Sequence, residues 1–265
     1  PLFMTVIYPS PGFGPVHRRR LGVSLGVNLL PSDGKVCTFD CIYCECVLNA
    51  DHRPHRPLPT RDEVRTALEH KLVEMNSQGA RPDVITFAGN GEPTCHPCFA
   101  DIIDDTIALR DALCPQAKIS VLTNATNLHR DDVFRALCRV DNNIEKVDTV
   151  NADYIAIADR PQSSSYSIDH VVAHLRRFAD EGRPCIVQTM FMSGTDAHGT
   201  DVDNTTDSFV APWLEALRTI RPSMVMIYTI DRETPIPSLR KATPLQLDAI
   251  AAQVRSAGIA CSVSY

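Results

Sequence analysis

The 265-residue sequence has no apolar run of the roughly 18 residues that a membrane-spanning helix needs. Its first twenty residues hold two Gly and four Pro in place of the apolar core of a signal peptide. Positive charge is also scarce, since 26 Lys and Arg stand against 32 Asp and Glu, for a net charge of −6. This balance removes a broad attraction to phosphates, so nucleic-acid binding is not favoured, although a local basic patch would still permit it. We expect a cytoplasmic protein with no membrane partner.

The composition is otherwise that of a globular protein. Hydrophobic residues make up 44% and charged residues 22% of the chain, which excludes wholesale disorder and a disulfide-stapled mini-protein. Of the ten cysteines, Cys37, Cys41, Cys44 and Cys46 fall within ten residues. Such clustering indicates a metal ion or an iron–sulfur cluster rather than the disulfides of a secreted protein.

Segments rich in Val and Ile alternate with segments of helical periodicity along the chain. This alternation predicts a parallel sheet whose strands are joined by right-handed helical crossovers. About six such units, with no linker or repeat, predict a single domain over residues 1–265 with an α/β fold, a partial (β/α)6 TIM-like barrel. Strands are expected at 23–29, 83–88, 118–123, 144–150, 185–192, 224–230 and 259–263.

The best-marked helix follows Thr60. Thr60 and Glu63 form a capping box, apolar residues follow at helical spacing, and Gly79 stands where a C-terminal cap belongs. Further helices are expected at about 98–113, 131–138 and 167–178, around Trp213, and after Thr243. Active sites of such barrels lie at the C-terminal ends of the strands, where this chain has its cysteine loop, a glycine-rich turn and an LTN segment.

Cys37, Cys41 and Cys44 are spaced as C-x3-C-x2-C in the loop after the first expected strand. A 4Fe-4S cluster has four irons, so three thiolates leave one iron free, and an open position is typical of catalytic metal sites. This spacing, with Tyr43 before the last cysteine, resembles the radical S-adenosylmethionine (SAM) superfamily. The resemblance implies a 4Fe-4S cluster whose free iron binds the methionine part of SAM, with Tyr43 packed beside the adenine.

A zinc site completed by Cys46, His52 or His55 is the alternative, because thiolates suit zinc as well as iron. A second motif disfavours zinc: the turn Gly89-Asn90-Gly91-Glu92-Pro93-Thr94 follows the next strand, and a zinc site does not need it. The turn resembles the GGE element of the superfamily, which implies that backbone groups of 89–91 and the Glu92 carboxylate engage the methionine amino group. Glycines allow such a close approach of the backbone to a ligand.

The resemblance extends over nearly the whole chain. Residues 14–28 (GPVHRRRLGVSLGVN), and later 140–148, 188–191 and 227–235, resemble a branch that includes the wybutosine-synthesising tRNA enzyme, although Arg18 departs from the usual Ser. Four further strand-end residues are expected to line the cofactor cavity: Asn124, Lys146, Asp148 and Gln188. Lys146 and Asp148 stand two apart on an expected strand and so share a face, with a plain structural ion pair as the alternative.

Two other groups of residues have two interpretations each. Arg19 and Arg20 are candidate substrate ligands, since guanidinium groups bind phosphate or carboxylate in a bidentate manner, but a solvated edge is the alternative. Cys95 and Cys98 either belong to a second cluster with Cys114 or Cys138 or act as small buried hydrophobes.

The resemblance implies an enzyme, an oxidoreductase or a transferase. An external electron donor such as flavodoxin or ferredoxin would reduce the cluster, and SAM would be cleaved to a 5′-deoxyadenosyl radical that abstracts a substrate hydrogen. A tRNA base, a glycyl-radical enzyme, a peptide and a small metabolite all remain open as substrates. The alternative class is a non-catalytic electron-transfer protein or zinc-stabilised scaffold, which the set of only three thiolates disfavours.

Overall fold

The computed structural model of the chain describes residues 6–18 and 22–265. An eight-stranded sheet forms its centre, with the strand order β1-β2-β3-β4-β5-β6-β8-β10. β1 is antiparallel to β2, and every later neighbouring pair is parallel. The strands of this sheet are β1 (Gly12–Arg18), β2 (Gly22–Val27), β3 (Val84–Phe87), β4 (Lys118–Thr123), β5 (Asn142–Lys146), β6 (Ile186–Met190), β8 (Met224–Tyr228) and β10 (Cys261–Ser264).

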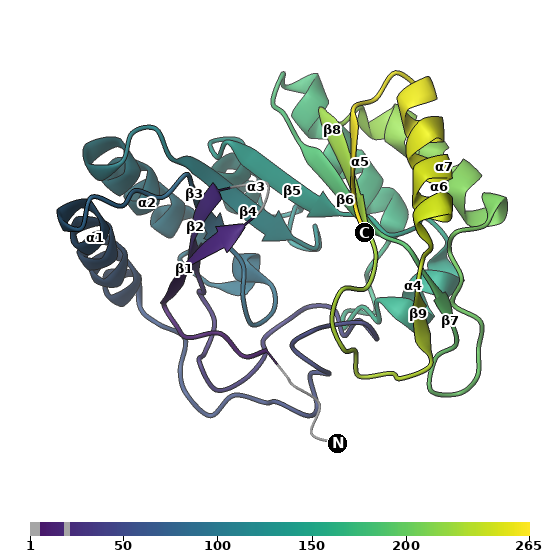
Figure 1. Cartoon of the computed structure of the whole chain (residues 1–265), viewed down its shortest axis with the longest axis horizontal. Coiled ribbons are helices and arrows are strands. Elements are labelled where there is room, and N and C mark those ends of the chain that lie inside the picture. The colour runs from purple at the N-terminus through teal and green to yellow at the C-terminus, as the bar shows by residue number, and fades with distance from the viewer. Residues whose placement is uncertain (1–5, 19–21) are drawn as a thin grey trace.

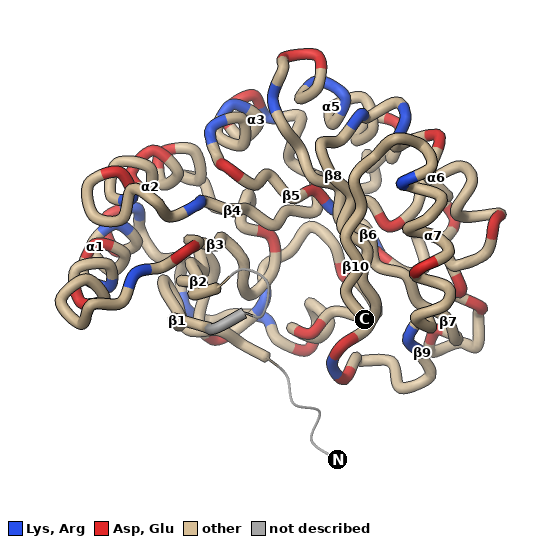
Figure 2. Tube along the Cα trace, turned by 45° about the horizontal axis from the view of Figure 1, so that its top comes forward, with Lys and Arg blue, Asp and Glu red and all other residues tan. Residues whose placement is uncertain are grey.

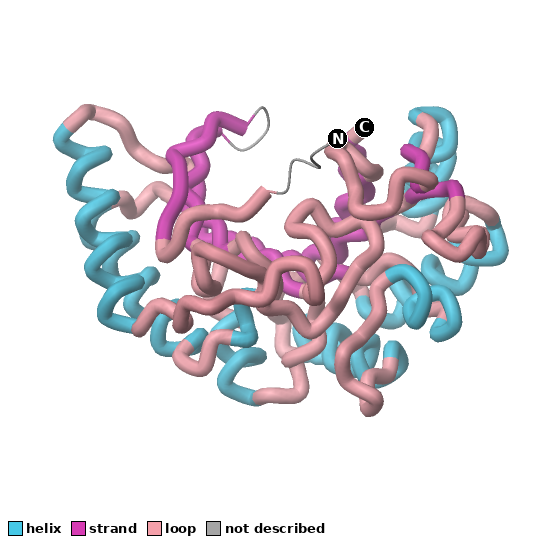
Figure 3. The backbone as a smooth tube through the Cα atoms, turned by 90° about the horizontal axis from the view of Figure 1, so that it is seen from below, coloured by secondary structure: helices cyan, strands magenta, loops and turns pink. Residues whose placement is uncertain are grey.

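Helices connect consecutive parallel strands and cover one side of the sheet. They are α1 (Arg61–Ser77), α2 (Phe99–Leu113), α3 (Asp131–Leu137), α4 (Ala152–Ala158), α5 (Ile168–Asp180), α6 (Asp207–Ile220) and α7 (Pro244–Ser256). Figures 1 and 3 show the strands as an arc with the helices on its outer side. The two edge strands, β1 and β10, are not paired with each other in the described sheet, so the arc stays open.

This architecture confirms the expected α/β fold with a partial TIM-like barrel. The capping box at Thr60 is present, and both of its hydrogen bonds are formed. The helix after Thr243 begins with a second capping box. Beyond the six expected units, the short last strand joins the sheet as β10, in parallel with β8.

Four parts of the fold differ from the sequence expectation. β1 was not expected, and neither was α4, which follows directly on the segment 144–150 that was expected to be a strand. The third difference is that β5 ends at Lys146, so Asp148 lies beyond the strand and not on its face. The fourth is a short antiparallel pair, β7 (Met192–Gly194) with β9 (Leu239–Lys241), which forms a separate two-stranded sheet.

The two faces of the sheet carry different side chains. On the outer face, residues such as Val121 and Val187 are buried in the main hydrophobic core beneath the helices. On the inner face, Lys146 and its register partner Gln188 line a cavity. Figure 2 shows that positive and negative charges are interspersed along the outer helices. None of the helices in the described part of the chain has both the length and the apolarity to cross a membrane.

Candidate active site

The cysteine loop between β2 and α1 is anchored by backbone hydrogen bonds to α4. The amide of Asp40 donates to the carbonyl of Asp159 (2.9 Å), and the amide of Ile42 donates to the carbonyl of Ala158 (2.9 Å). The last carbonyls of a helix have no partner within the helix, so the C-terminus of α4 is suited to accept these bonds. The short helix that the sequence did not reveal therefore fixes the position of the cysteines.

A second anchor joins the cysteine loop to the glycine-rich turn after β3. The amide of Val36 donates to the carbonyl of Asn90 (2.9 Å), and the amide of Glu92 donates to the carbonyl of Val36 (2.9 Å). Gly91 lies between them with φ of 125°, and a Cβ there would stand 1.9 Å from the Val36 carbonyl oxygen. Only glycine allows the two segments to approach this closely.

The loop, the turn and the C-terminal ends of the strands enclose a cavity of about 190 Å³. Most of the predicted site residues line it: Cys37, Cys41, Cys44, Tyr43, Gly89, Gly91, Glu92, Asn124, Lys146 and Gln188. A second cavity of about 230 Å³ shares Tyr43 and Cys44 with the first and extends to Met190 and Tyr228. The cysteine loop thus forms the wall between two neighbouring spaces.

Two predicted residues lie outside the lining of the first cavity. Asn90 is fully buried, and its side chain donates to the carbonyls of Tyr8 (2.9 Å) and Pro31 (2.8 Å) and accepts from the Tyr8 amide (2.8 Å). Its side chain therefore holds the N-terminal segment. Asp148 instead orients lining residues, because it accepts a hydrogen bond from the Tyr43 hydroxyl and lies 2.5 Å from Nζ of Lys146. Arg19 and Arg20 lie outside the described residues.

Glu92 is 2% exposed and accepts four hydrogen bonds. Oε1 accepts from the amide of Thr94 (3.1 Å) and from the hydroxyls of Thr94 (2.5 Å) and Thr123 (2.6 Å), whereas Oε2 accepts only from the amide of Asn124 (2.7 Å). Burial raises the pKa of this carboxyl, and the four donors oppose the rise. Oε2 accepts one hydrogen bond and Oε1 accepts three, so Oε2 has the capacity to accept a further hydrogen bond.

Lys146 is held between two buried carboxylates. Its ammonium lies 2.6 Å from Oδ1 of Asp159 as well as 2.5 Å from Asp148, and it stands 5.2 Å from the ring centres of both Phe39 and Tyr43. Burial alone would lower the pKa of Lys146, but the two carboxylates outweigh it and raise that pKa. The ammonium therefore remains charged at the wall of the cavity.

Lys35 is a site residue that the sequence analysis missed. Its ammonium is buried, donates to the carbonyl of Val47 (2.8 Å) and lines the same cavity as the three cysteines. Burial opposes its charge, but the neighbouring cysteines and Asp40 outweigh burial and raise its pKa. A basic residue two positions before Cys37 was the available signal. Asp159, by contrast, follows a helix that the sequence did not reveal and gave no signal.

The electrostatic environment differs among the three cysteines. Burial, together with the Glu92 carboxylate, raises the pKa of Cys37 to about 12, and burial also raises the pKa of Cys41 well above its ordinary value. A hydrogen bond from Cys46 and the nearby Lys35 ammonium lower the pKa of Cys44. The side-chain nitrogen Nδ2 of Asn124 lies 3.6 Å from the Cys37 sulfur and 2.9 Å from Oγ1 of Thr38. Asn124, at the end of β4, thus links this thiol to the neighbouring strand end.

The three cysteines form a donor set that suits an iron–sulfur cluster. Within residues 6–18 and 22–265, no three His, Cys, Asp or Glu side chains are arranged around one point as a metal ion requires. The thiolates that bind a cubane attach to different irons, so they need to border one cavity without meeting at one point. Cys37, Cys41 and Cys44 border the 190 Å³ cavity in this way. Of the other cysteines, Cys98, Cys114 and Cys138 pack in or against the hydrophobic core.

Comparison with known sequences gives distant relatives. No protein-family model matches the chain. A UPF0026 protein of Methanocaldococcus jannaschii is 25% identical over 239 residues, which cover 90% of this chain and 68% of the relative. A UPF0026 protein of Helicobacter pylori is 27% identical over 238 residues, which cover 89% of this chain and 70% of the relative.

Solved structures give clearer similarity. A radical SAM methyltransferase from Sphaerobacter thermophilus matches 91% of this chain and 66% of its own, with a TM-score of 0.67 and 18% identity. Streptococcus suis SuiB bound to S-adenosylmethionine matches with a TM-score of 0.63 and 12% identity over 91% of this chain, which spans 50% of SuiB. TYW1 with a lysine-pyruvate adduct matches with a TM-score of 0.61 and 10% identity, over 88% of this chain and 73% of that one. The chain thus has the partial TIM-barrel fold of radical SAM enzymes.

Proposed function

We propose that the protein is a radical SAM enzyme whose 4Fe-4S cluster is bound by Cys37, Cys41 and Cys44. The observation that carries the proposal is the shared lining of one cavity by these three cysteines, Glu92 and Lys146, at the strand ends where barrel enzymes place their active sites. The fold shared with radical SAM enzymes supports the same class.

The two neighbouring cavities suit the two ends of SAM. The 190 Å³ cavity next to the cysteines would take the methionine part, with Oε2 of Glu92 accepting from its ammonium group. The 230 Å³ cavity, lined by Tyr43, Met190 and Tyr228, would take the adenine, because aromatic and thioether groups offer an apolar surface to a purine ring. Tyr43, which lines both cavities, would then pack beside the adenine, as the resemblance to the superfamily implies.

Cys37, Cys41 and Cys44 would hold the cluster, and together with SAM it would supply the one-electron chemistry that generates a 5′-deoxyadenosyl radical for hydrogen abstraction from a substrate. The residues of this chain contribute binding and positioning. Asp148 and Asp159 hold Lys146 at the cavity wall, and the α4 carbonyls fix the cysteine loop. Cys41 and Tyr43 are only 9% and 8% exposed, which would limit the access of water to this part of the site.

The finer assignments belong to the same proposal. Flavodoxin or ferredoxin would deliver the electron, and the protein would act in the cytoplasm as an oxidoreductase or a transferase. The sequence segments shared with the wybutosine-synthesising branch support a place in that branch, whose substrate is tRNA. The net charge of −6 weakens tRNA as the substrate, and a glycyl-radical enzyme, a peptide or a small metabolite fits the site equally well.

Anaerobic reconstitution with iron and sulfide tests the proposal. We expect about four irons per chain, absorbance typical of iron–sulfur clusters, and formation of 5′-deoxyadenosine from SAM after reduction with dithionite. A fully loaded cluster that produces no 5′-deoxyadenosine would reject the enzyme and favour an electron-transfer protein. Binding of one zinc in preference to iron would reject the cluster itself.

A further inference from the structure

Asn124, the residue directly after β4, has a buried side chain whose hydrogen-bonding capacity is used within the protein. Its Oδ1 accepts from the backbone amide of Thr126 (3.2 Å) and from the Thr126 hydroxyl (2.7 Å). Its Nδ2 donates to Oγ1 of Thr38 (2.9 Å) and to the Cys37 sulfur (3.6 Å). An asparagine amide has two acceptor sites and two donor hydrogens, so these four contacts occupy it completely.

The orientation of this amide follows from its contact with the backbone of Thr126. A backbone N–H can only donate, so the atom of Asn124 that faces it is the oxygen, and the nitrogen faces Thr38 and Cys37. The Thr38 and Thr126 hydroxyls lie 2.6 Å apart, so the three side chains form a closed ring of hydrogen bonds. One hydrogen of Nδ2 belongs to this ring, and the other is directed at the sulfur.

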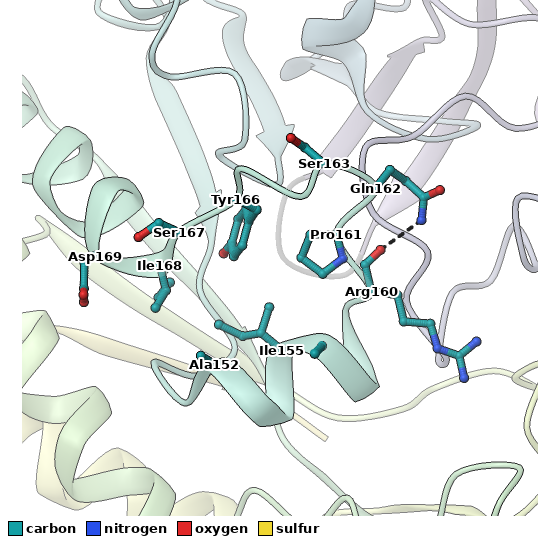
Figure 4. Close-up of a pocket in the computed structure, with 11 residues that line it drawn as sticks. Ala152, Ile155, Arg160, Pro161, Gln162, Ser163, Tyr166, Ser167, Ile168 and Asp169 are labelled. Atoms are coloured by element: carbon teal, nitrogen blue, oxygen red, sulfur yellow. Dashed lines mark hydrogen bonds between the residues drawn. The ribbon is translucent and has the colours of Figure 1, made fainter.

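Backbone contacts hold both sides of this arrangement. On one side, the amide of Asn124 donates to Oε2 of Glu92 (2.7 Å). On the other side, the carbonyl of Thr38 accepts from the amide of Gln162 (2.8 Å), in the segment after α4. The side chain of Gln162 in turn donates to the carbonyl of Arg160 (3.0 Å), the bond drawn in Figure 4. The Asn124 amide therefore has little freedom to turn away from the cysteine.

A hydrogen bond to a cysteine sulfur bears on the electron transfer that an iron–sulfur cluster performs. Reduction adds an electron, and part of the added negative charge is carried by the sulfur ligands. A donor at a sulfur therefore stabilises the reduced state more than the oxidised state, and it raises the reduction potential. Asn124 provides such a donor without placing a further charge at the cavity that Lys35 and Lys146 already line.

We infer that Asn124 is a positioning residue of the cluster: its side-chain amide holds the Cys37 sulfur and raises the reduction potential of the cluster. The inference rests on the proposed function, because it needs a cluster on Cys37. It also gives Asn124 a role other than binding SAM through its side chain, although this residue lines the cofactor cavity. The amide has no donor or acceptor left for SAM once its four protein contacts are made.

A redox titration of the reconstituted cluster without SAM, followed by electron paramagnetic resonance, tests the inference in Asn124→Leu. Leucine has a similar shape and brings neither a charge nor a donor. We expect an equilibrium constant for reduction about tenfold smaller, the effect of one hydrogen bond to a charged group, which is a potential about 60 mV lower. The variant should still hold about four irons, because all three cysteines remain. Its affinity for SAM, titrated separately, should change less than about twofold.

Asn127→Leu is the matched control, because Asn127 makes the same kind of contacts three residues later in the loop. Its Nδ2 donates to the Thr94 hydroxyl (3.0 Å) and lies 3.9 Å from the sulfur of Cys95, which is not among the proposed ligands. The potential of this variant should equal that of the unmodified protein. A loss of stability common to both variants thus cannot explain a shift that only Asn124→Leu shows.

Asn124→Asp is the second variant, for the case in which Asn124→Leu does not fold. It keeps the oxygen that faces the Thr126 amide, removes the Nδ2 donor and adds a negative charge, so its potential should fall at least as far. An unchanged potential in a folded variant with a full cluster would overturn the inference and leave the proposed function intact. An unchanged potential with SAM affinity at least about tenfold lower would assign Asn124 to the cofactor instead.

The test also separates the inference from the radical chemistry. The potential is measured without SAM, so a cluster that yields no 5′-deoxyadenosine would reject the proposed enzyme and still show the effect of Asn124. An unmodified protein that takes up no iron–sulfur cluster would overturn the proposed function and this inference together.

Discussion

The ammonium of Lys146 at the end of β5 lies 2.6 Å from the carboxylate of Asp159, the C-terminal cap residue of α4. The backbone carbonyl of the same Asp159 accepts a hydrogen bond from the backbone amide of Asp40 in the cysteine loop. One residue therefore connects a charge on the cavity wall with the backbone that positions the cysteines. This link joins three segments that are far apart in the sequence.

Lys146→Met should destabilise the fold strongly. It removes the only cation between Asp148 and Asp159 in the described site and leaves two buried carboxylates facing each other, a loss of about 3–5 kcal/mol in the free energy of unfolding. Lys71→Met is the control, because Lys71 pairs with Glu74 on the surface of α1, and its loss should be at most about 0.5 kcal/mol. Urea denaturation of both variants measures the difference, and similar values would contradict this view of Lys146.

Cys41→Ala should abolish cluster binding and leave the barrel mostly folded, because Cys41 lies in a loop that the α4 carbonyls hold independently. Iron content after anaerobic reconstitution and far-ultraviolet circular dichroism measure the two effects. Cys138→Ala serves as the control and should retain full iron, since Cys138 packs against the core away from the cavity. A Cys41→Ala protein with full iron and activity would refute this ligand assignment.

Glu92→Gln should weaken SAM binding about tenfold to a hundredfold, the effect of one charge-assisted hydrogen bond. The structure adds a second effect. The NH2 group of a glutamine would face backbone or hydroxyl groups that now donate hydrogen bonds to the Glu92 carboxylate. The melting temperature should therefore fall as well. Glu74→Gln, on the exposed side of α1, should change neither quantity. Unchanged SAM affinity by titration would remove Glu92 from the cofactor site.

Gly91→Ala should cost about 3 kcal/mol in the free energy of unfolding. The new Cβ would stand 1.9 Å from the Val36 carbonyl oxygen, and φ of 125° is unfavourable for alanine. Gly79→Ala tests the backbone effect alone, since Gly79 has φ of 70° with no atom near its Cβ position, and should cost about 1 kcal/mol. Equal losses in the two proteins would show that the close approach at Gly91 is unimportant.

Glu145→Gln should stabilise the protein at neutral pH. Glu145 is 0% exposed, neither of its carboxylate oxygens has a hydrogen-bond partner, and burial raises its pKa well above 4.5. The stability that the neutral acid provides is fully present below pH 4.5 and is lost as the pH rises toward the folded-state pKa. A glutamine stays neutral, so its advantage should grow with pH by about 1.4 kcal/mol per unit in that interval.

Urea denaturation of the unmodified and Glu145→Gln proteins at several pH values measures this advantage. The comparison between the two proteins removes the contribution of all other titrating groups. Stability curves that run parallel from pH 5 to pH 8 would show that Glu145 titrates normally in the folded protein, against the expectation from its burial.

The sequence by itself determined the parts of this protein that depend on local pattern. The spacing of Cys37, Cys41 and Cys44, the capping box at Thr60 and the alternation of strands and helices each lie within a short stretch of chain. Periodicity and capping depend on neighbouring residues, so these predictions needed no knowledge of distant contacts. The position of the glycine-rich turn at a strand end followed from the same alternation.

Only the tertiary structure decided which of these residues meet and in what role. Tyr43 meets Asp148 across 105 positions of sequence, and Asn90 turns to the N-terminal segment and away from the cavity. Such contacts depend on the register of each crossover and on the place where a strand stops, as with β5 at Lys146. The short α4 helix was not predicted from the sequence, yet its C-terminus holds the cysteine loop and supplies Asp159. The pKa values of Lys35 and Glu92 depend on burial, on neighbouring charges and on hydrogen-bond donors, which come together only when the distant segments pack.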